Sequence, residues 1–120
     1  MVAAPETPDT HHLINASRLA RMKRDAYLVN VARGSLIDES ALAVALTERR
    51  IAGAALDVAS EEPLPESSPL WKLENCFITP HLSGASDALW ERQAELLLEN
   101  LERWFDGREL LNRIDLTRGY

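Results

Sequence analysis

The chain has 120 residues, of which 46% are hydrophobic, and a formal net charge of −6 at pH 7. This length and composition suit one globular domain with a buried core rather than a disordered tail. The acidic balance disfavours a nucleic-acid-binding protein, and no apolar run approaches the roughly 18 residues needed to cross a bilayer. The first residues, "MVAAPETPDT", lack the basic and apolar regions of a signal peptide. The single cysteine, Cys76, is expected to be a buried thiol in a reducing compartment. We therefore expect a cytoplasmic protein.

The first half of the chain predicts a helix, a strand and a second helix. Asn15 suits the N-cap of a helix over 16–23, because its side chain can accept a hydrogen bond from a free backbone N–H. The near-continuous apolar run "AYLVNVA" (26–32) predicts a strand buried on both faces, as in parallel sheets. Asp38 suits the N-cap of the next helix, in which Leu42 and Leu46 fall on one apolar stripe.

The second half predicts two more strands and one long helix. The runs "AGAALDV" (52–58) and "CFIT" (76–79) predict the strands. The loop between them, from 59 to about 75, is rich in proline, which excludes a long helix or strand. Ser86 suits the N-cap of the last helix, whose apolar residues recur at helical spacing up to Phe105 and which Gly107 ends. The tail after Gly107 is expected to be irregular.

This alternation of helices and strands predicts an α/β fold. Right-handed crossovers between successive strands would give a parallel sheet of about three strands, with flanking helices and a long C-terminal helix. Doubly wound sheets usually have more strands than this. The pattern therefore predicts part of a Rossmann-like sheet.

Charged side chains follow each of the three predicted strands. Arg33 comes after the first strand, Asp57 ends the second with Glu62 beyond it, and His81 follows the third. Since ligands of open parallel sheets bind outside the carboxyl ends of the strands, we expect these side chains to gather at one edge. A guanidinium can grip a carboxylate through two hydrogen bonds. An imidazole oriented by a carboxylate can transfer a proton near neutral pH.

Each of these residues also has an ordinary structural interpretation. A strand-end arginine taken alone is more often a surface ion-pair partner, and a histidine after a proline is more often a loop residue. The "EEP" sequence that contains Glu62 is typical of an acidic loop. His11 and His12 suit a solvated turn and receive no role, and no metal site is expected. Spacing alone leaves the structural and the functional interpretations open.

Four segments of the chain resemble the D-2-hydroxyacid dehydrogenases, the family of D-3-phosphoglycerate dehydrogenase and glyoxylate/hydroxypyruvate reductase. The segment "APETPDTHHLINASRLARMK" resembles the cofactor-side loop and helix of that family. The segments "AYLVNVARGSLIDESAL", "IAGAALDVASEEPLPESSPLW" and "NCFITPHLSGAS" resemble those that carry its catalytic arginine, glutamate and histidine. The four segments come in family order and cover nearly the whole chain, so the resemblance is specific.

The resemblance implies that Arg33, Glu62 and His81 are catalytic. Arg33 would bind the substrate carboxylate and keto oxygen, His81 would be the general acid in carbonyl reduction and the base in the reverse reaction, and Glu62 would hold the imidazole. The residues implied to bind the cofactor are Val31, Ala32, Arg33, Asp57, His81, Ser83 and Gly84. The cofactor would be NAD or NADP, with Asp57 near the nicotinamide carboxamide, and the substrate a small 2-hydroxy or 2-keto acid.

The chain departs from the family pattern at two loops and lacks one motif. Ala59 follows "DV" where the family usually has an aromatic residue, and "KRDA" (23–26) stands for the usual "KPGA". No two of the 5 glycines lie two positions apart, so no G-x-G-x-x-G is present. The resemblance thus implies that residues 1–120 are the C-terminal half of a Rossmann-type NAD(P)-binding domain. The glycine-rich half and the substrate domain would be absent, in an expressed fragment or a naturally truncated frame.

Two functions are open at this point. The first is a part of an oxidoreductase that is nearly inactive alone, because it lacks the main anchor for the dinucleotide phosphates. The alternative is a non-catalytic half-Rossmann module that serves oligomerisation or interaction. In either case the small sheet and the apolar last helix predict a homo-oligomer, most simply a C2 dimer. Neither nucleic acid nor a membrane is expected as a partner.

Overall fold

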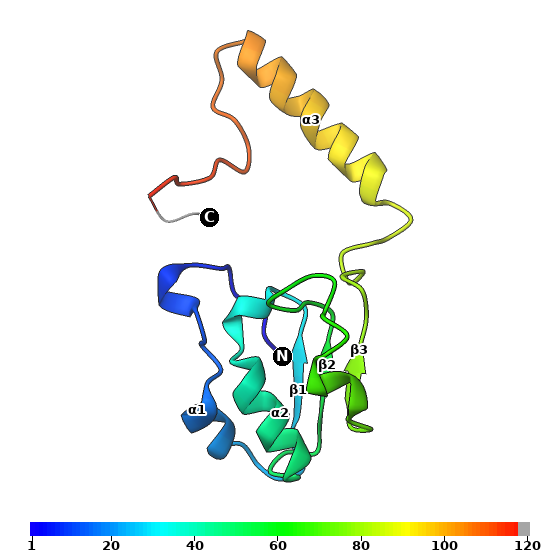
Figure 1. Cartoon of the computed structure of the whole chain (residues 1–120). Coiled ribbons are helices and arrows are strands. Elements are labelled where there is room, and N and C mark those ends of the chain that lie inside the picture. Colours follow the sequence, from blue (N-terminus) through cyan, green and yellow to red (C-terminus); the bar gives the residue numbers. More distant parts are fainter. Residues whose placement is uncertain (118–120) are drawn as a thin grey trace. The chain divides into compact units, whose positions relative to one another are not determined.

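The computed structural model describes residues 1–117 and divides the chain into two compact units, Met1–Ser83 and a segment that begins at Gly84. The first unit contains helices α1 (Ala16–Ala20) and α2 (Glu39–Thr47) and strands β1 (Tyr27–Asn30), β2 (Gly53–Leu56) and β3 (Cys76–Ile78) (Figure 1). The second unit contains helix α3 (Leu89–Phe105). Single 3₁₀ turns occur at Pro8–Thr10, Gly34–Leu36 and Pro69–Lys72.

The three strands form one parallel sheet in the order β1-β2-β3. The pairing of β1 with β2 sets Leu28 opposite Ala54, and the pairing of β2 with β3 sets Ala55 opposite Phe77. The predicted α/β fold with a partial, Rossmann-like parallel sheet is therefore confirmed. On the outer edge of β1, Val2 adds a parallel bridge, in which its N–H donates to the Val29 carbonyl at 2.7 Å.

Side-chain caps fix the starts of the two helices of the first unit, as predicted. The Asn15 side chain accepts a hydrogen bond from the Arg18 N–H at 3.1 Å. The Asp38 side chain accepts one from the Ala41 N–H at 2.9 Å. Each cap satisfies one of the backbone donors that a helix start leaves free, which typically stabilises the helix by about 1 kcal/mol.

The core of the first unit lies on one face of the sheet. Helices α1 and α2 pack together and cover this face, burying a cluster of apolar side chains that includes Leu19, Leu28, Leu36, Leu42, Leu46, Ile51, Leu56 and Leu70. On the opposite face, Tyr27 is 71% exposed and Phe77 is 68% exposed. The prediction that the first strand is buried on both faces is therefore wrong for the described residues, because both helices of this unit pack on the same side.

Cys76 is half-buried in β3, at the edge of the core, rather than fully buried. Burial, with a smaller contribution from the negative charge of Glu39, raises the pKa of the thiol. A raised pKa lowers the fraction of reactive thiolate at neutral pH, which is consistent with a structural cysteine.

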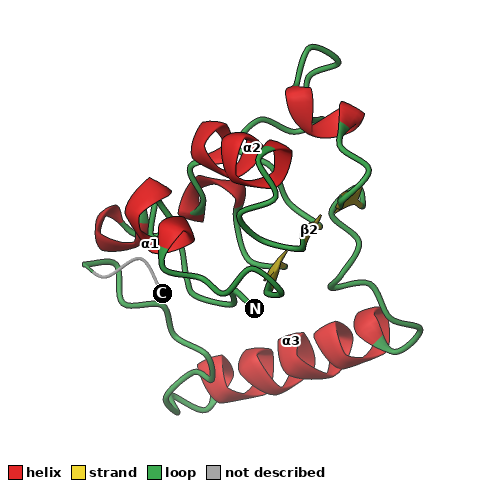
Figure 2. Ribbon diagram, turned by 90° about the horizontal axis from the view of Figure 1, so that it is seen from below, coloured by secondary structure: helices red, strands yellow, loops and turns green. Residues whose placement is uncertain are grey.

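Helix α3 is one uninterrupted helix of 17 residues (Figure 2). The prediction that Ser86 caps it is wrong: the N-cap is Ala88, which makes no side-chain cap, and the Ser86 carbonyl accepts a turn hydrogen bond from the Leu89 N–H. The predicted end is confirmed, because Gly107 follows the helix with a φ of +67°, a conformation that glycine adopts without steric cost.

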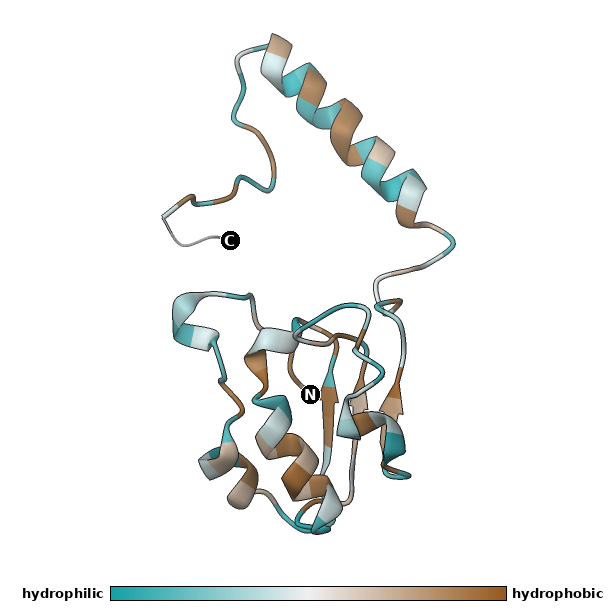
Figure 3. Cartoon of the chain, viewed as in Figure 1, coloured by the Kyte–Doolittle hydropathy of each residue, from teal (hydrophilic) through white to brown (hydrophobic). Residues whose placement is uncertain are grey.

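The surface of α3 is strongly amphipathic, and bands of apolar residues recur along it (Figure 3). No residue of the helix is buried. Its large exposed apolar side chains are Trp90, Leu97, Leu98, Leu101, Trp104 and Phe105. Beyond Gly107 the chain forms turns only, and the remainder of the predicted irregular tail lies outside the described residues. Within residues 1–117, no helix is both long enough and apolar enough to cross a membrane.

Candidate active site

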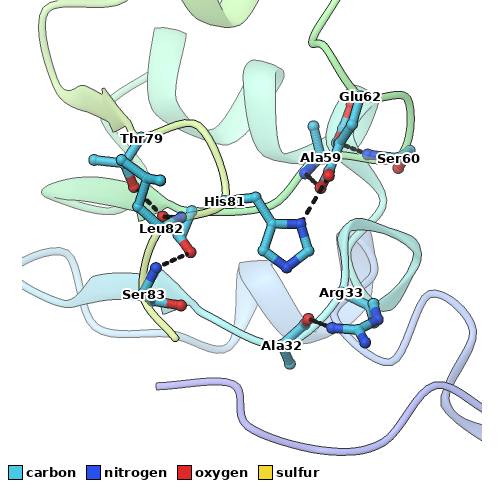
Figure 4. A network of polar contacts seen from close by, with 11 residues as sticks. Ala32, Arg33, Ala59, Ser60, Glu62, Thr79, His81, Leu82 and Ser83 are labelled. Carbon is cyan, nitrogen blue, oxygen red and sulfur yellow. Dashed lines mark hydrogen bonds and ion pairs between the residues drawn. The ribbon is translucent and has the colours of Figure 1, made fainter. Parts of the chain in front are cut away.

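The carboxyl ends of β2 and β3 bring Glu62 and His81 together, as their positions in the sequence predict. Nδ1 of His81 lies 2.8 Å from Oε2 of Glu62 (Figure 4). The other carboxylate oxygen of Glu62 accepts a hydrogen bond from the Ala59 N–H at 3.0 Å. In the described part of the chain no residue bonds to Nε2 of His81. With Nδ1 paired to the carboxylate, Nε2 is the nitrogen that can exchange a proton with a ligand.

Glu62 is held in its ionised form. The hydrogen bond to His81, the Ala59 N–H and the positive charges of His81 and Arg33 lower the pKa of its carboxyl group. Because the pKa is lowered on folding, Glu62 contributes stability above its ordinary pKa and loses it as the pH falls through the lowered value. The side chains of His81 and Glu62 are 47% and 41% exposed. At this exposure the ion pair adds little to stability, so orientation of the imidazole is its main effect.

Arg33 follows the end of β1 by three residues. Its positive charge helps to lower the pKa of Glu62. Its Nη1 donates to the Ala32 carbonyl at 2.7 Å, and Figure 4 shows the guanidinium beside Ala32. The guanidinium makes no hydrogen bond to Glu62 or His81 among the described residues. Its other donors therefore stay available for a ligand.

Asn30 holds the turn that carries Arg33. Its side chain is at the buried end of β1, where the residue is 1% exposed. Nδ2 of Asn30 donates to the Arg33 carbonyl at 2.8 Å, and Oδ1 accepts from the Ala32 N–H at 3.1 Å. Both ends of the buried amide are thus satisfied by the turn, which fixes the backbone around Arg33. The role of Asn30 was not predicted, although a single amide side chain within an apolar strand indicated that it needs a polar partner.

Asp57 is the second buried polar residue at the strand ends, at 6% exposure. The Ser83 and Thr79 hydroxyls and the N–H groups of Leu82 and Ser83 lower the pKa of its carboxyl group, against the opposing effect of burial. The carboxylate is therefore ionised at neutral pH.

A hollow of about 300 Å³ opens beside Asp57. Its lining includes Val31, Asp57 and Ser83, three of the residues predicted to bind a cofactor, together with Val29, Phe77 and Leu82. An apolar hollow with one carboxylate acceptor fits a flat ring that bears an amide, as nicotinamide does. The structure does not bring Ala32 to this hollow, and Gly84 belongs to the second unit.

A larger cavity, of about 510 Å³, adjoins Glu62 and His81. The rest of its lining is mostly apolar and comes from the loop after β2 and from β3, including Leu64, Trp71 and Ile78. In the described residues no group of three or more His, Cys, Asp and Glu side chains is placed to hold a metal ion.

Gly34 allows the Arg33 turn to touch the loop that leads to Glu62. A Cβ atom at Gly34 would lie 1.9 Å from the Ala59 carbonyl carbon and 2.2 Å from the Ser60 nitrogen. Glu39, at the start of α2, fixes the same loop by accepting the Ser60 N–H at 2.6 Å. Neither Gly34 nor Glu39 was predicted to belong to the site, because their contacts depend on how distant segments pack.

We expect Gly34→Ala to lower the free energy of unfolding by at least about 1–3 kcal/mol, the usual cost of inserting atoms into packed structure. The added methyl would meet backbone atoms, which cannot rotate away as a side chain could. Urea unfolding measures the effect. Gly84→Ala is the matched control, because a Cβ there meets no atom within 4 Å, and a Gly34→Ala variant as stable as Gly84→Ala would contradict the expectation.

Comparison with known proteins identifies the family. Residues 1–83 match the D-isomer specific 2-hydroxyacid dehydrogenase family, NAD binding domain. The chain belongs to this family. It is 49% identical, over 100 residues, to the glyoxylate reductase of Thermofilum pendens, covering 83% of this chain and 30% of that protein. The resemblance that the sequence motifs indicated is therefore confirmed.

Solved structures of D-isomer specific 2-hydroxyacid dehydrogenases have the same fold. One from Xanthobacter autotrophicus Py2, in complex with NADPH and MES, aligns with a TM-score of 0.91 at 45% identity, covering 99% of this chain and 48% of that chain. An NADPH-dependent glyoxylate/hydroxypyruvate reductase from Sinorhizobium meliloti, in complex with NADP and sulfate, aligns with a TM-score of 0.89 at 29% identity, covering 98% and 38%. The present chain thus spans less than half the length of these relatives. Its family is an oxidoreductase family whose cofactor is NAD or NADP.

Proposed function

We propose that Arg33, Glu62 and His81 form the catalytic set of an NAD(P)-dependent oxidoreductase that interconverts a 2-keto acid and a D-2-hydroxy acid. The pairing of His81 Nδ1 with Glu62 at 2.8 Å, in a chain of this family, is the observation that carries the proposal. When bound, the dinucleotide supplies or accepts the hydride at its nicotinamide ring. The protein residues have the remaining tasks, which are substrate binding, orientation and proton transfer.

His81 is the proton-transfer group of the proposed reaction. Nε2 gives a proton to the keto oxygen during reduction and takes it from the hydroxyl group in the reverse direction. Glu62 holds the ring through Nδ1, which leaves Nε2 as the nitrogen that can reach the substrate. Lowering of the Glu62 pKa supports this arrangement, because it keeps the carboxylate charged at the pH of the reaction.

Arg33 binds the substrate in this proposal. Its guanidinium has donors free beyond the one bond to the Ala32 carbonyl. A planar guanidinium can hold the substrate carboxylate with two parallel hydrogen bonds and can also polarise the keto oxygen. A small 2-keto acid presents both groups on adjacent carbons, which is why this substrate class suits the site.

The nicotinamide end of NAD or NADP is proposed to lie against the hollow at the strand ends. Val31, Asp57 and Ser83 line that hollow. In the sequence, Ala32 directly follows Val31 and Gly84 directly follows Ser83. Asp57 would accept from the carboxamide N–H. The complexes of the Xanthobacter and Sinorhizobium relatives with NADPH and NADP support a dinucleotide here.

The single cysteine has no disulfide partner within the chain, which suits the cytoplasm as the compartment.

We propose this activity for a protein in which the present segment follows a glycine-rich half and a substrate domain. To test it, residues 1–120 are joined behind the corresponding upstream part of the Thermofilum pendens glyoxylate reductase. Oxidation of NADH and NADPH is then followed with glyoxylate and hydroxypyruvate. We expect turnover that a Glu62→Gln, His81→Ala double variant lacks. A folded chimera that binds dinucleotide but reduces no 2-keto acid would contradict the proposal.

The 120-residue chain by itself should bind NAD(H) with a Kd above about 1 mM, which corresponds to roughly −4 kcal/mol. The reason is that its sequence has no G-x-G-x-x-G, so the usual backbone cradle for the pyrophosphate is missing. Isothermal titration calorimetry measures this affinity. A micromolar Kd would show that the expectation is wrong.

We also propose that the chain forms a homo-oligomer, most simply a C2 dimer. The exposed apolar residues of α3 and the uncovered sheet face at Tyr27 and Phe77 favour association, and they also favour the alternative function as an interaction module. Light scattering at tens of micromolar should give a dimer mass. Leu97→Glu with Leu101→Glu should weaken the dimer at least about tenfold, whereas the polar-residue control Glu95→Gln should not. A stable monomer of the wild-type chain would disprove this proposal.

A further inference from the structure

The carboxylate of Asp57 is bonded to the turn that carries His81. Oδ1 accepts a hydrogen bond from the Thr79 hydroxyl and one from the Leu82 N–H at 2.9 Å. Oδ2 accepts one from the Ser83 N–H at 2.7 Å (Figure 4). The backbone carbonyl of Asp57 also accepts the His81 N–H at 2.8 Å. One buried residue at the end of β2 therefore contacts the turn on both sides of His81.

The backbone of His81 needs such support. Its φ is +53°, in the left-handed region that residues with a Cβ atom rarely adopt. A residue in this conformation persists only where its surroundings hold it. The bonds from Asp57 to Thr79, Leu82 and Ser83 provide that constraint, because they fix the residues before and after the left-handed position.

Packing does not replace these bonds. The side chain of His81 is 47% exposed, and its one polar side-chain contact in the described residues is with Glu62. Glu62 lies on a different loop, so the two side chains meet only if both backbones are correctly placed. An exposed ring on a strained turn takes its direction from the backbone that carries it.

We propose that Asp57 is a positioning residue for His81: its carboxylate holds the Thr79–Ser83 turn in the conformation that presents the imidazole to Glu62. The inference rests on the proposed function only in that it treats His81 as the proton-transfer group. It adds a second task to Asp57 beside the proposed contact with nicotinamide.

The substitution Asp57→Asn in the 120-residue chain tests this proposal without turnover or cofactor. The carboxylate partners are all donors, so the amide group of asparagine would face one of them with a donor of its own. We expect the Leu82 and Ser83 amides to exchange with solvent roughly tenfold faster or more. We also expect the Glu62 carboxyl pKa, followed by carbon NMR, to rise toward its ordinary value as the His81 bond is lost. The control is Asp25→Asn, an exposed residue whose side chain makes no hydrogen bond within the described part of the chain.

If the Asp57→Asn chain does not fold, the Thr79→Val variant tests the positioning role of Asp57 instead. It removes one donor to the carboxylate, leaves Asp57 in place and preserves side-chain shape. We expect smaller changes of the same sign in the Glu62 pKa and in exchange at Leu82 and Ser83. Thr47→Val is the matched control, because the Thr47 hydroxyl bonds to the Ala43 carbonyl within α2. The proposal would be overturned if a folded Asp57→Asn chain kept the wild-type Glu62 pKa and the wild-type exchange rates at Leu82 and Ser83. If Asp57→Asn does not fold, the same result in Thr79→Val would overturn it. Activity of the chimera bears only on the proposed function, so the two can fail separately.

Discussion

Replacing His81 with alanine should lower kcat of the chimeric enzyme by about 10²- to 10⁴-fold, the usual contribution of a general acid or base. Alanine cannot give a proton to the keto oxygen, so water would have to replace Nε2. Glu62 would lose its partner as well, because Nδ1 of His81 makes the bond at 2.8 Å. Steady-state rates of 2-keto acid reduction over a range of pH measure the effect. The loss should appear in kcat rather than in the affinity for the dinucleotide.

His11→Ala is the matched control for this experiment, since His11 is exposed in a turn outside the strand ends. It should leave kcat unchanged. A His81→Ala enzyme whose kcat stayed within about threefold of the parent would contradict the proton-transfer role of His81, because a general acid or base typically contributes at least about 10²-fold.

Arg33→Lys should lower kcat/KM of the same enzyme by about 10- to 100-fold. Lysine keeps the positive charge but cannot supply the planar fork that binds a carboxylate through two bonds. Loss of one charge-assisted hydrogen bond costs about 1.5–3 kcal/mol, and each 1.4 kcal/mol corresponds to about tenfold. The effect should fall mainly on KM for the keto acid, which initial-rate measurements at saturating NADPH or NADH resolve.

The control for Arg33→Lys is Arg24→Lys, an exposed position in the turn before β1. This change should leave kcat/KM unaltered. An Arg33→Lys enzyme with kcat/KM within about twofold of the parent would show that Arg33 does not clamp the substrate carboxylate.

The parts of the fold that depend on neighbours in the sequence were predictable. Asn15 and Asp38 cap their helices through bonds to residues three positions ahead, which a short window of sequence contains. The gathering of Glu62 and His81 followed from one topological rule, that parallel strands end at the same edge. The resemblance to the family implied roles for these residues that spacing alone had left open, and these roles stay predictions.

Features that depend on the folding of distant segments were not predictable. The sequence of β1 is apolar throughout, so it did not show that α1 and α2 both pack on one face and leave Tyr27 exposed. Ser86 has a good capping side chain, yet its carbonyl closes a turn and α3 begins later. The approach of Gly34 to Ala59 and the bonds from Asp57 to Ser83 join residues about 25 positions apart.

The polar contacts of Arg33, Asp57, Glu62 and His81 within residues 1–117 all join positions between Asn30 and Ser83. The proposed reacting groups and the residues that orient them thus lie in one continuous stretch of the amino-acid sequence. Recombination between homologous genes can exchange that stretch as one segment, and no side chain would then be separated from the residues that hydrogen-bond to it. Helix α3 lies outside this stretch, so such an exchange would leave it unchanged.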